Sequence, residues 1–253
     1  MKILGISRGA TYSPNMANND AAIFTAVADE LKAMGHEVDT IREDEMVGFN
    51  YAPYDRVFTM ARDIYSLVML EKDTDVTTQQ KFINSIDGIL TCTNKASVAS
   101  RMLDAGIPQP EFLVGEQHRL MFCSTESKED IIPPLWLKNS DSSAVVAEDV
   151  VFCRTHEEVN QALEAMEKRD VHLWMAQEHQ RGDLVKFYGV EGTNFFHWHY
   201  ASEGHSKFGQ EEVNGKEKGY AFNASRIKLY ADMLAKKLRV PVYGGDVVID
   251  ETS

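Results

Sequence analysis

The stretch MAQEHQRGDLVKFYGV, residues 175–190, predicts two strands joined by a tight turn at residues 181–183. Side chains alternate between the two faces of a strand, so Lys186 in the second strand shares a face with Leu184 and Tyr188. A cation on a half-buried face needs an anion beside it. The alternative is a lysine on an exposed edge strand, where its charge opposes aggregation. Both interpretations keep the strand, the turn and the second strand.

The composition indicates an ordinary soluble globular protein. The chain has 253 residues, enough for one large domain or two modest ones, and it is 43% hydrophobic and 26% charged. No apolar run is long enough to cross a bilayer. The first residues, MKILGISRG, favour an opening strand over a signal peptide, because their short apolar run soon meets Ser7 and Arg8. We therefore expect a cytoplasmic protein without a membrane partner.

The charge and the cysteines narrow the range of partners. The formal net charge is −13, which makes the chain a poor general ligand for nucleic acid. A local basic pocket for a small anion is compatible with that charge, so the expected partner is a small, anionic substrate. Cys92, Cys123 and Cys153 form no CxxC pair, which predicts reduced thiols rather than disulfides. The sequence leaves a homo-oligomer open.

Strands and helices alternate in the N-terminal third. Strands are expected at residues 2–7, 36–41, 55–60 and 87–90, and helices over about 19–34 and from about residue 64. The first helix has the apolar residues Ile23, Val27 and Leu31 on one face, and the second carries Ile64, Leu67 and Val68. This alternation predicts an open parallel α/β sheet.

Two arginines lie just after predicted strands of this sheet. Arg8 follows the first strand and Arg62 follows the third. Ligands of open α/β sheets bind at the carboxyl edge of the strands, so either arginine is a candidate to hold an anionic substrate. The alternative is a surface ion pair. No GxGxxG follows the first strand, which argues against an ordinary dinucleotide fold.

Residues 83–110, INSIDGILTCTNKASVASRMLDAGIPQP, carry a second pattern. Asn94-Lys95 precedes a predicted helix with Met102 and Leu103 on its buried side, and Gly106 ends that helix before Ile107-Pro108. This run resembles the Asp-Lys, helix, Gly-Ile-Pro-x-Pro run of ATP-grasp enzymes such as D-alanine–D-alanine ligases, with Asn94 in place of the usual Asp. Residues 175–190 resemble the nucleotide hinge of the same superfamily, which begins with a Gln-Glu pair.

The strand LWLK, residues 135–138, lies between these two patterns. Leu135 and Leu137 would point to one side, and Trp136 and Lys138 to the other. ATP-grasp proteins carry a lysine in this strand that reaches the phosphates, followed by a loop that closes over them. Here the loop, residues 139–143, lacks glycine and offers serine hydroxyls instead. The alternative for Lys138 is a surface lysine with its stem on apolar neighbours.

The resemblance implies a complete ATP site. Main-chain groups near Glu178 and His179 would meet adenine, Asp183 would take the ribose hydroxyls, and lysines would meet the phosphates. The implied ATP-binding residues are Lys95, Lys138, Gln177, Glu178, His179, Asp183 and Lys186.

The C-terminal segment carries the implied metal ligand. A helix is expected over about 224–238, followed by VPVYGGDVVID. The resemblance implies that Asp246 binds catalytic Mg²⁺, a cation that prefers oxygen ligands. ATP-grasp proteins continue with a further strand bearing Asp/Glu-x-Asn, whereas the sequence given ends at Ser253. We therefore expect an incomplete metal site in the sequence as given.

Two further segments of the C-terminal half carry predictions. His197 and His199 alternate within FFHWHY, residues 195–200, so they share a strand face. They suggest either a metal pair or a polar strand face that lines a cleft, and in the second case His197 is a candidate substrate ligand. Residues 203–219 are rich in glycine and charge and predict a mobile loop.

Thr155 and Glu158 predict a capping box at the start of a helix that runs to about Lys168.

These patterns predict an α/β protein whose C-terminal part is α+β. An N-terminal open parallel sheet over residues 1–92 would be followed by an ATP-grasp fold of two subdomains, 93–175 and 176–253. The implied function is ATP- and Mg²⁺-dependent joining of a carboxylate to an amine through an acyl phosphate. The alternatives are a small-molecule kinase like the inositol phosphate kinases and a nucleotide-binding regulator without turnover.

Overall fold

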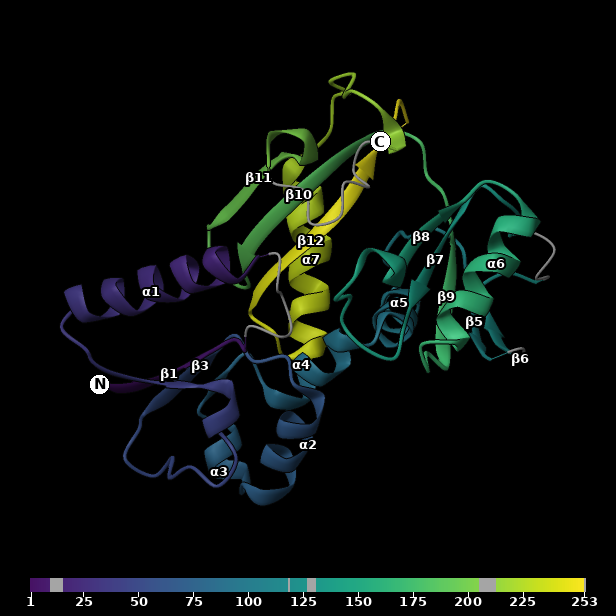
Figure 1. The fold of residues 1–253 in the computed structure, drawn as a ribbon. Helices are drawn as coiled ribbons and strands as arrows, with labels where there is room; N and C mark the ends of the chain where they lie inside the picture. The colour runs from purple at the N-terminus through teal and green to yellow at the C-terminus, as the bar shows by residue number, and fades with distance from the viewer. Residues whose placement is uncertain (10–15, 118, 127–130, 205–212, 253) are drawn as a thin grey trace. The chain divides into compact units, whose positions relative to one another are not determined.

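A computed structural model of the protein describes residues 1–9, 16–117, 119–126, 131–204 and 213–252 (Figure 1). The chain divides into two compact units. Unit 1 comprises Met1–Thr93 and Lys237–Val242, and unit 2 comprises Asn94–Lys236 and Tyr243–Ser253. Within the described ranges, no helix is long and apolar enough to span a bilayer. The predicted division of the second half at residues 175–176 stays a prediction.

Unit 1 contains the predicted open parallel sheet. Its strands run in the order β2-β1-β3-β4, and every neighbouring pair is parallel. The strands are β1 (Lys2–Ser7), β2 (Glu37–Arg42), β3 (Arg56–Thr59) and β4 (Phe82–Ile83). The helices are α1 (Ala17–Ala33), α2 (Ile64–Asp73), α3 (Val76–Gln79) and α4 (Ile86–Thr93). The buried core of this unit is formed by side chains from β1, β3, β4, α2 and α4, together with those of the connecting segments before and after β3.

Residues 87–90 were predicted as a strand, and this prediction is wrong, because they lie in helix α4. Ile86 and Ile89 are both buried, at the three-residue spacing of one helix face. A Cβ on Gly88 would lie 2.2 Å from the carbonyl oxygen of Leu238. The glycine therefore permits a close approach between segments far apart in the sequence, which local pattern alone does not reveal.

The predicted buried face of α1 is also wrong. Ile23 and Val27 are exposed, whereas Phe24 and Ala28 are buried. The ring of Phe24 packs against the ring of Phe58 in β3, with centroids 5.2 Å apart. This aromatic contact sets the rotation of the helix, so the buried stripe is shifted by one residue from the prediction.

Unit 2 contains two sheets. The five-stranded sheet has the order β6-β5-β9-β7-β8, with all neighbours antiparallel. Its strands are β5 (Phe112–Glu116), β6 (Arg119–Cys123), β7 (Leu135–Asn139), β8 (Val150–Cys153) and β9 (Leu173–Glu178). The three-stranded sheet has the order β11-β10-β12, made of β10 (Asp183–Val190), β11 (Phe196–Tyr200) and β12 (Val242–Ile249). The helices are α5 (Lys95–Asp104), α6 (His156–Glu167) and α7 (Ala224–Leu238).

Capping residues begin two helices of unit 2 where the sequence predicts them. The side chain of Asn94 accepts a hydrogen bond from the N–H of Ser97 at the start of α5. The hydroxyl of Thr155 accepts one from the N–H of Glu158 at the start of α6. The carboxylate of Glu158, however, accepts from the N–H of Arg154, so the predicted reciprocal bond of the capping box forms one residue earlier.

Two details of the predicted segments differ or fall outside the described chain. In α5 the buried residues are Ala96 and Ala99, whereas Leu103, which was predicted to be buried, is exposed. Of the loop predicted at residues 203–219, residues 205–212 lie outside the described ranges.

The predicted strand, turn and second strand of residues 175–190 are present as β9, a turn and β10, although β9 and β10 do not pair with each other as a hairpin would. A Cβ on Gly182 would lie 2.2 Å from the carbonyl oxygen of Ile249, and the φ of Gly182 is +154°. Both the space and the backbone conformation therefore require glycine at this turn. Strands β9 and β10 belong to different sheets, so the turn at Gly182 joins the two sheets of unit 2.

An irregular edge borders the five-stranded sheet. The pairing of β5 with β6 shifts register between Val114 and Gly115. Strand β6 lies at the edge of the sheet and exposes Leu120, Met121 and Phe122. On the other side of β5, the inner strands β9 and β7 supply the buried side chains that pack under α6.

We expect Leu137→Ala to lower the free energy of unfolding by about 2–5 kcal/mol, because Leu137 is fully buried in the core of the five-stranded sheet and its truncation leaves a cavity. Leu120→Ala, the same change on the exposed edge strand β6, should cost far less. Urea unfolding of both variants measures the difference. Equal losses would contradict this placement of the core.

Candidate functional site

Lys138 projects from β7 on the face opposite the core. Leu135 and Leu137 are buried, whereas Trp136 and Lys138 lie on the other side of the strand, as the alternation predicts. The Lys138 ammonium donates a hydrogen bond to the Oε1 of Gln177 on the neighbouring strand β9. Burial and, to a smaller extent, the positive charge of Lys95 lower the pKa of Lys138 to about 8, while Asp246 acts in the opposite direction. Four predicted site residues therefore interact in unit 2.

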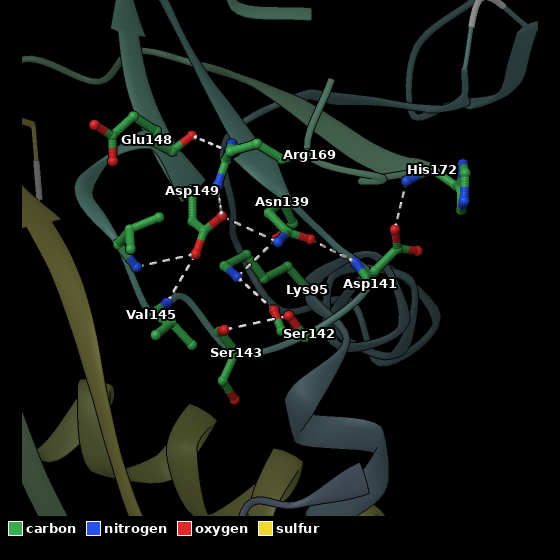
Figure 2. Close-up of polar contacts among 11 residues, drawn as sticks. Lys95, Asn139, Asp141, Ser142, Ser143, Val145, Glu148, Asp149, Arg169 and His172 are labelled. Carbon is green, nitrogen blue, oxygen red and sulfur yellow. Dashed lines mark hydrogen bonds and ion pairs between the residues drawn. The ribbon is translucent and has the colours of Figure 1, made fainter. Parts of the chain in front are cut away.

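Lys95 is the first residue of α5 and ties that helix to the loop after β7. Its ammonium donates to the carbonyl oxygens of Asn139, at 2.7 Å, and Ser142, at 3.2 Å (Figure 2). Ser140, fully buried, accepts a hydrogen bond from the N–H of Ala96 through its hydroxyl. The loop predicted to cover the phosphates thus lies directly against the N-terminus of α5.

The far side of this loop is fixed by Asp149, a buried carboxylate (Figure 2). It accepts hydrogen bonds from the N–H groups of Val145 and Val146, from the Nδ2 of Asn139 and from the guanidinium of Arg169. Burial raises the pKa of Asp149, but these hydrogen bonds outweigh that effect and lower the pKa overall. The carboxylate therefore stays ionised and joins the two ends of the loop.

Asp141 fixes the same loop from a third direction (Figure 2). Its carboxylate accepts hydrogen bonds from the N–H groups of His172, at 2.6 Å, and Leu173, at 3.0 Å. The loop lacks glycine, and its shape is held instead by side-chain contacts to neighbouring elements. Such a rigid frame suits a site that must hold a ligand in one position.

Lys186 and Asp246 form an ion pair across β10 and β12. The ammonium of Lys186 lies 3.3 Å from the Oδ1 of Asp246. The side chain of Lys186 is 22% exposed, and that of Asp246 is 60% exposed. The anion that a half-buried Lys186 needs is therefore the predicted metal ligand itself, and the Asp246 carboxylate is open to a further partner.

Asp183 is placed differently from its predicted role. It is buried, and its two oxygens accept hydrogen bonds from the N–H groups of Lys218, Gly219 and Tyr220 at 2.7–3.0 Å. Burial raises the pKa of Asp183, and these backbone donors lower it by more. The carboxylate anchors the segment 218–220, and the assignment of Asp183 to ribose stays a prediction.

The hinge residues Glu178 and His179 lie beside an aromatic group that the sequence interpretation missed. The Nδ1 of His179 accepts a hydrogen bond from the indole N–H of Trp136, at 3.1 Å, and its ring packs against Phe152. Burial lowers the pKa of His179, which keeps this nitrogen available as an acceptor. Trp136 pairs directly with Phe152 across β7 and β8. The sequence did hold a signal for this aromatic group, because strand alternation places Trp136 on the same face as Lys138.

The carboxylate of Glu178 accepts a hydrogen bond from Gln180, two residues further along the hinge.

The predicted substrate residues belong to other elements of the chain. Arg8 and Arg62 belong to unit 1. His197 is exposed on β11, where its ring lies 6.1 Å from that of His199. Among the described residues, no group of three or more His, Cys, Asp or Glu is arranged to hold a metal ion. A metal site at His197 and His199 would therefore need further ligands from outside the described residues.

Known proteins give no match by sequence but a clear match by structure. No protein-family model and no curated protein matches the chain. A D-alanine–D-alanine ligase from Bacillus anthracis, complexed with ATP, matches with a TM-score of 0.61 and 13% identity, over 99% of this chain and 82% of that chain. D-alanyl-alanine synthetase A from Vibrio cholerae O1 biovar eltor str. N16961 matches with a TM-score of 0.67 and 9% identity, over 100% and 85%.

A RimK domain protein ATP-grasp from Sphaerobacter thermophilus DSM 20745 matches with a TM-score of 0.63 and 11% identity, over 100% of this chain and 87% of that chain. These matches cover both units, and they confirm the predicted fold class of an N-terminal α/β sheet followed by the two sheets of unit 2. At such identities the likeness concerns the fold alone. The chain has the ATP-grasp fold.

Proposed function

We propose that unit 2 binds ATP and that the protein is an ATP-dependent ligase that joins a carboxylate to an amine. The observation that carries the proposal is Lys138, which donates a hydrogen bond to Gln177 and interacts electrostatically with Lys95 and Asp246 in an ATP-grasp fold. The ammonium groups of Lys95 and Lys138 repel each other, and the pKa of Lys138 is lowered to about 8. A bound anion would offset this repulsion. A triphosphate supplies that anion.

The surroundings of Lys138 suit the other parts of a nucleotide. Trp136 lies on the same face of β7, two residues away, and packs with Phe152 and His179. Aromatic side chains of this kind offer an apolar surface to a flat base, with hinge backbone groups near Glu178 to meet its polar edge. The loop of residues 139–143, held by Lys95 and Asp149, is the candidate cover for the phosphates.

Asp246 fits a magnesium ion that accompanies the nucleotide. Its carboxylate is exposed, and Mg²⁺ commonly takes one or two protein carboxylates together with phosphate oxygens and waters. When bound, such an ion would neutralise phosphate charge. Lys186 already lies beside Asp246 and would hold the carboxylate in place or meet a phosphate oxygen itself.

The proposed reaction has two steps. A carboxylate oxygen of the substrate bonds to the γ-phosphorus while the bond to the bridging oxygen of ADP breaks, which gives an acyl phosphate and ADP. An amine nitrogen then bonds to the acyl carbon, inorganic phosphate leaves, and the amine loses a proton. The lysines stabilise the negative charge that develops on the transferring group, and their fixed positions hold it in line. The ATP-dependent ligases among the solved structures of this fold support this reaction class.

We expect Lys138→Met and Lys186→Met each to weaken ATP binding by about tenfold or more, because a charge-assisted hydrogen bond contributes roughly 1.5–3 kcal/mol. Calorimetric titration with ATP measures the affinity, and thermal melting checks the fold. The matched control is Lys168→Met, which removes an exposed lysine at the end of α6 in the same unit. Parent-like affinity in both site variants would remove the phosphate assignment.

The lowered pKa of Lys138 predicts a pH dependence of ATP affinity. The free protein loses the Lys138 proton as pH rises through about 8, whereas bound phosphates favour the protonated ammonium and raise its pKa. The affinity for ATP should therefore be highest below pH 8 and should fall above it, by at most about tenfold per pH unit. Lys138→Arg, which keeps its charge, should lose this dependence. An unchanged parent affinity between about pH 7 and 9.5 would contradict the role of Lys138.

Asp246→Asn should reduce ADP formation far more than ATP affinity, because transfer depends on a fixed γ-phosphoryl group. The control is Glu164→Gln, an exposed carboxylate on α6. The same assay separates the reaction classes when amines are added or withheld. Amine-dependent ADP formation supports the ligase, a phosphorylated product without amine points to a kinase, and tight ATP binding without any turnover points to a regulator.

A further inference from the structure

The sheet of unit 1 has a topological switch point between β1 and β3. From β1 the chain passes to β2 on one side, and it then returns to β3 and β4 on the other side. In open parallel sheets this reversal leaves a crevice outside the carboxyl ends of the two central strands, where ligands bind. Arg8 follows the end of β1 directly, and Arg62 lies three residues beyond the end of β3.

Arg8 is engaged by protein groups at this edge. Its Nε donates to the carbonyl oxygen of Met60 at 3.0 Å, and its Nη1 donates to both carboxylate oxygens of Asp20 at 3.1–3.2 Å. Both side chains of this ion pair are mostly enclosed. Arg8 therefore joins α1 to the end of β3, and its charge is largely balanced by Asp20.

Arg62 is not engaged in this way. Within the described part of the chain, its guanidinium makes no hydrogen bond or ion pair, although its backbone N–H donates to Glu43. No described buried side-chain nitrogen lacks a partner, so the guanidinium nitrogens of Arg62 must reach solvent. Burial lowers the pKa of Arg62, and the nearby charge of Arg8 lowers it further. An arginine that is partly enclosed, cationic and without a partner offers a fork of donors to an anion.

The acidic groups around Arg62 are all committed elsewhere. Glu43 is buried and accepts the N–H groups of Gly9, Arg62 and Asp63. Asp20 pairs with Arg8, and Asp63 caps α2 through the N–H and hydroxyl of Ser66. None of the three carboxylates forms an ion pair with Arg62.

The balance of charge at this edge favours one kind of anion. The Cys92 thiol interacts with Arg62, and burial raises its pKa, so it adds no charge at neutral pH. Two cations and three carboxylates leave a net negative surrounding. A single guanidinium in such a place favours a planar monoanion over a phosphate dianion, because each added negative charge is repelled by the same carboxylates.

We propose that Arg62 binds the carboxylate of a small-molecule substrate at the switch point between β1 and β3. The guanidinium donates two parallel N–H···O bonds to the carboxylate, and Arg8 contributes by its charge and by holding the end of β3. This proposal rests on the proposed function in one respect, namely that the bound carboxylate belongs to the substrate of the ligase. The site itself lies wholly in unit 1 and does not require ATP.

The test uses the full chain without nucleotide. Acetate, glycine and β-alanine are titrated against protein carrying ¹⁵N-labelled arginine, and inorganic phosphate is titrated for comparison. We expect the Arg62 side-chain signal to shift with the carboxylates, and their affinity to fall about tenfold or more in Arg62→Met. The matched control is Arg56→Met, an exposed arginine at the opposite end of the same strand, which should bind carboxylates like the parent.

A second measurement keeps the proposal testable if Arg62→Met does not fold. In the parent protein, carboxylates should protect Arg62 from modification by phenylglyoxal, read by peptide mass spectrometry, and should leave Arg56 unprotected. The proposal is overturned if no carboxylate binds, if Arg62→Met binds carboxylates as well as Arg56→Met does, or if phosphate binds more tightly than carboxylates. ATP binding by unit 2 is measured separately, so a failure here and a failure of the proposed function are distinguishable.

Discussion

The requirement that backbone N–H groups of loops find partners governs much of this structure. Buried donors without partners are costly, and loops have no regular ladder to supply acceptors. Three buried carboxylates supply them instead. Glu43 accepts N–H groups that follow β1 and β3, Asp149 accepts those of the loop after β7, and Asp183 accepts those of residues 218–220. Each of these acids is shielded from solvent, and each joins segments that the strands alone would leave separate.

This use of acids explains how the loop after β7 manages without glycine. A glycine-rich loop brings its backbone close to a ligand through conformational freedom. Here Asp149, Asp141 and Lys95 hold the backbone from three directions, so the loop has a defined shape before any ligand arrives. Preorganisation of this kind lowers the entropy lost on binding. It also makes the position of Lys138, on the strand that feeds the loop, part of the same rigid frame.

Local patterns in the sequence predicted the elements better than their contacts. Alternation on β7, the helix after Asn94 and the turn at residues 181–183 were visible in the local sequence, whereas the close approach of Ile249 to Gly182 was not. The helix at residues 87–90 was mistaken for a strand because the space beside Gly88 is set by Leu238, about 150 residues away. Contacts between residues far apart in the sequence also could not be predicted for the candidate ATP site.

Lys138, Lys186 and Asp246 could be singled out from the sequence as charged residues on predicted strands, and their roles stay predictions. Which charges meet each other depends on tertiary contacts, so the sequence did not show that Asp183 faces a backbone segment or that Trp136 packs with His179.

The register shift between Val114 and Gly115 bears on how the protein behaves in concentrated solution. The edge strand β6 presents Leu120, Met121 and Phe122 to solvent, and within the described residues no strand pairs with its outer side. A flat edge of this composition would template pairing with another chain. A bulge bends and twists a strand edge, which opposes such stacking. A Cβ on Gly115 would lie 2.1 Å from the ring of Trp174, so glycine is required at the point where the register of the edge pairing shifts.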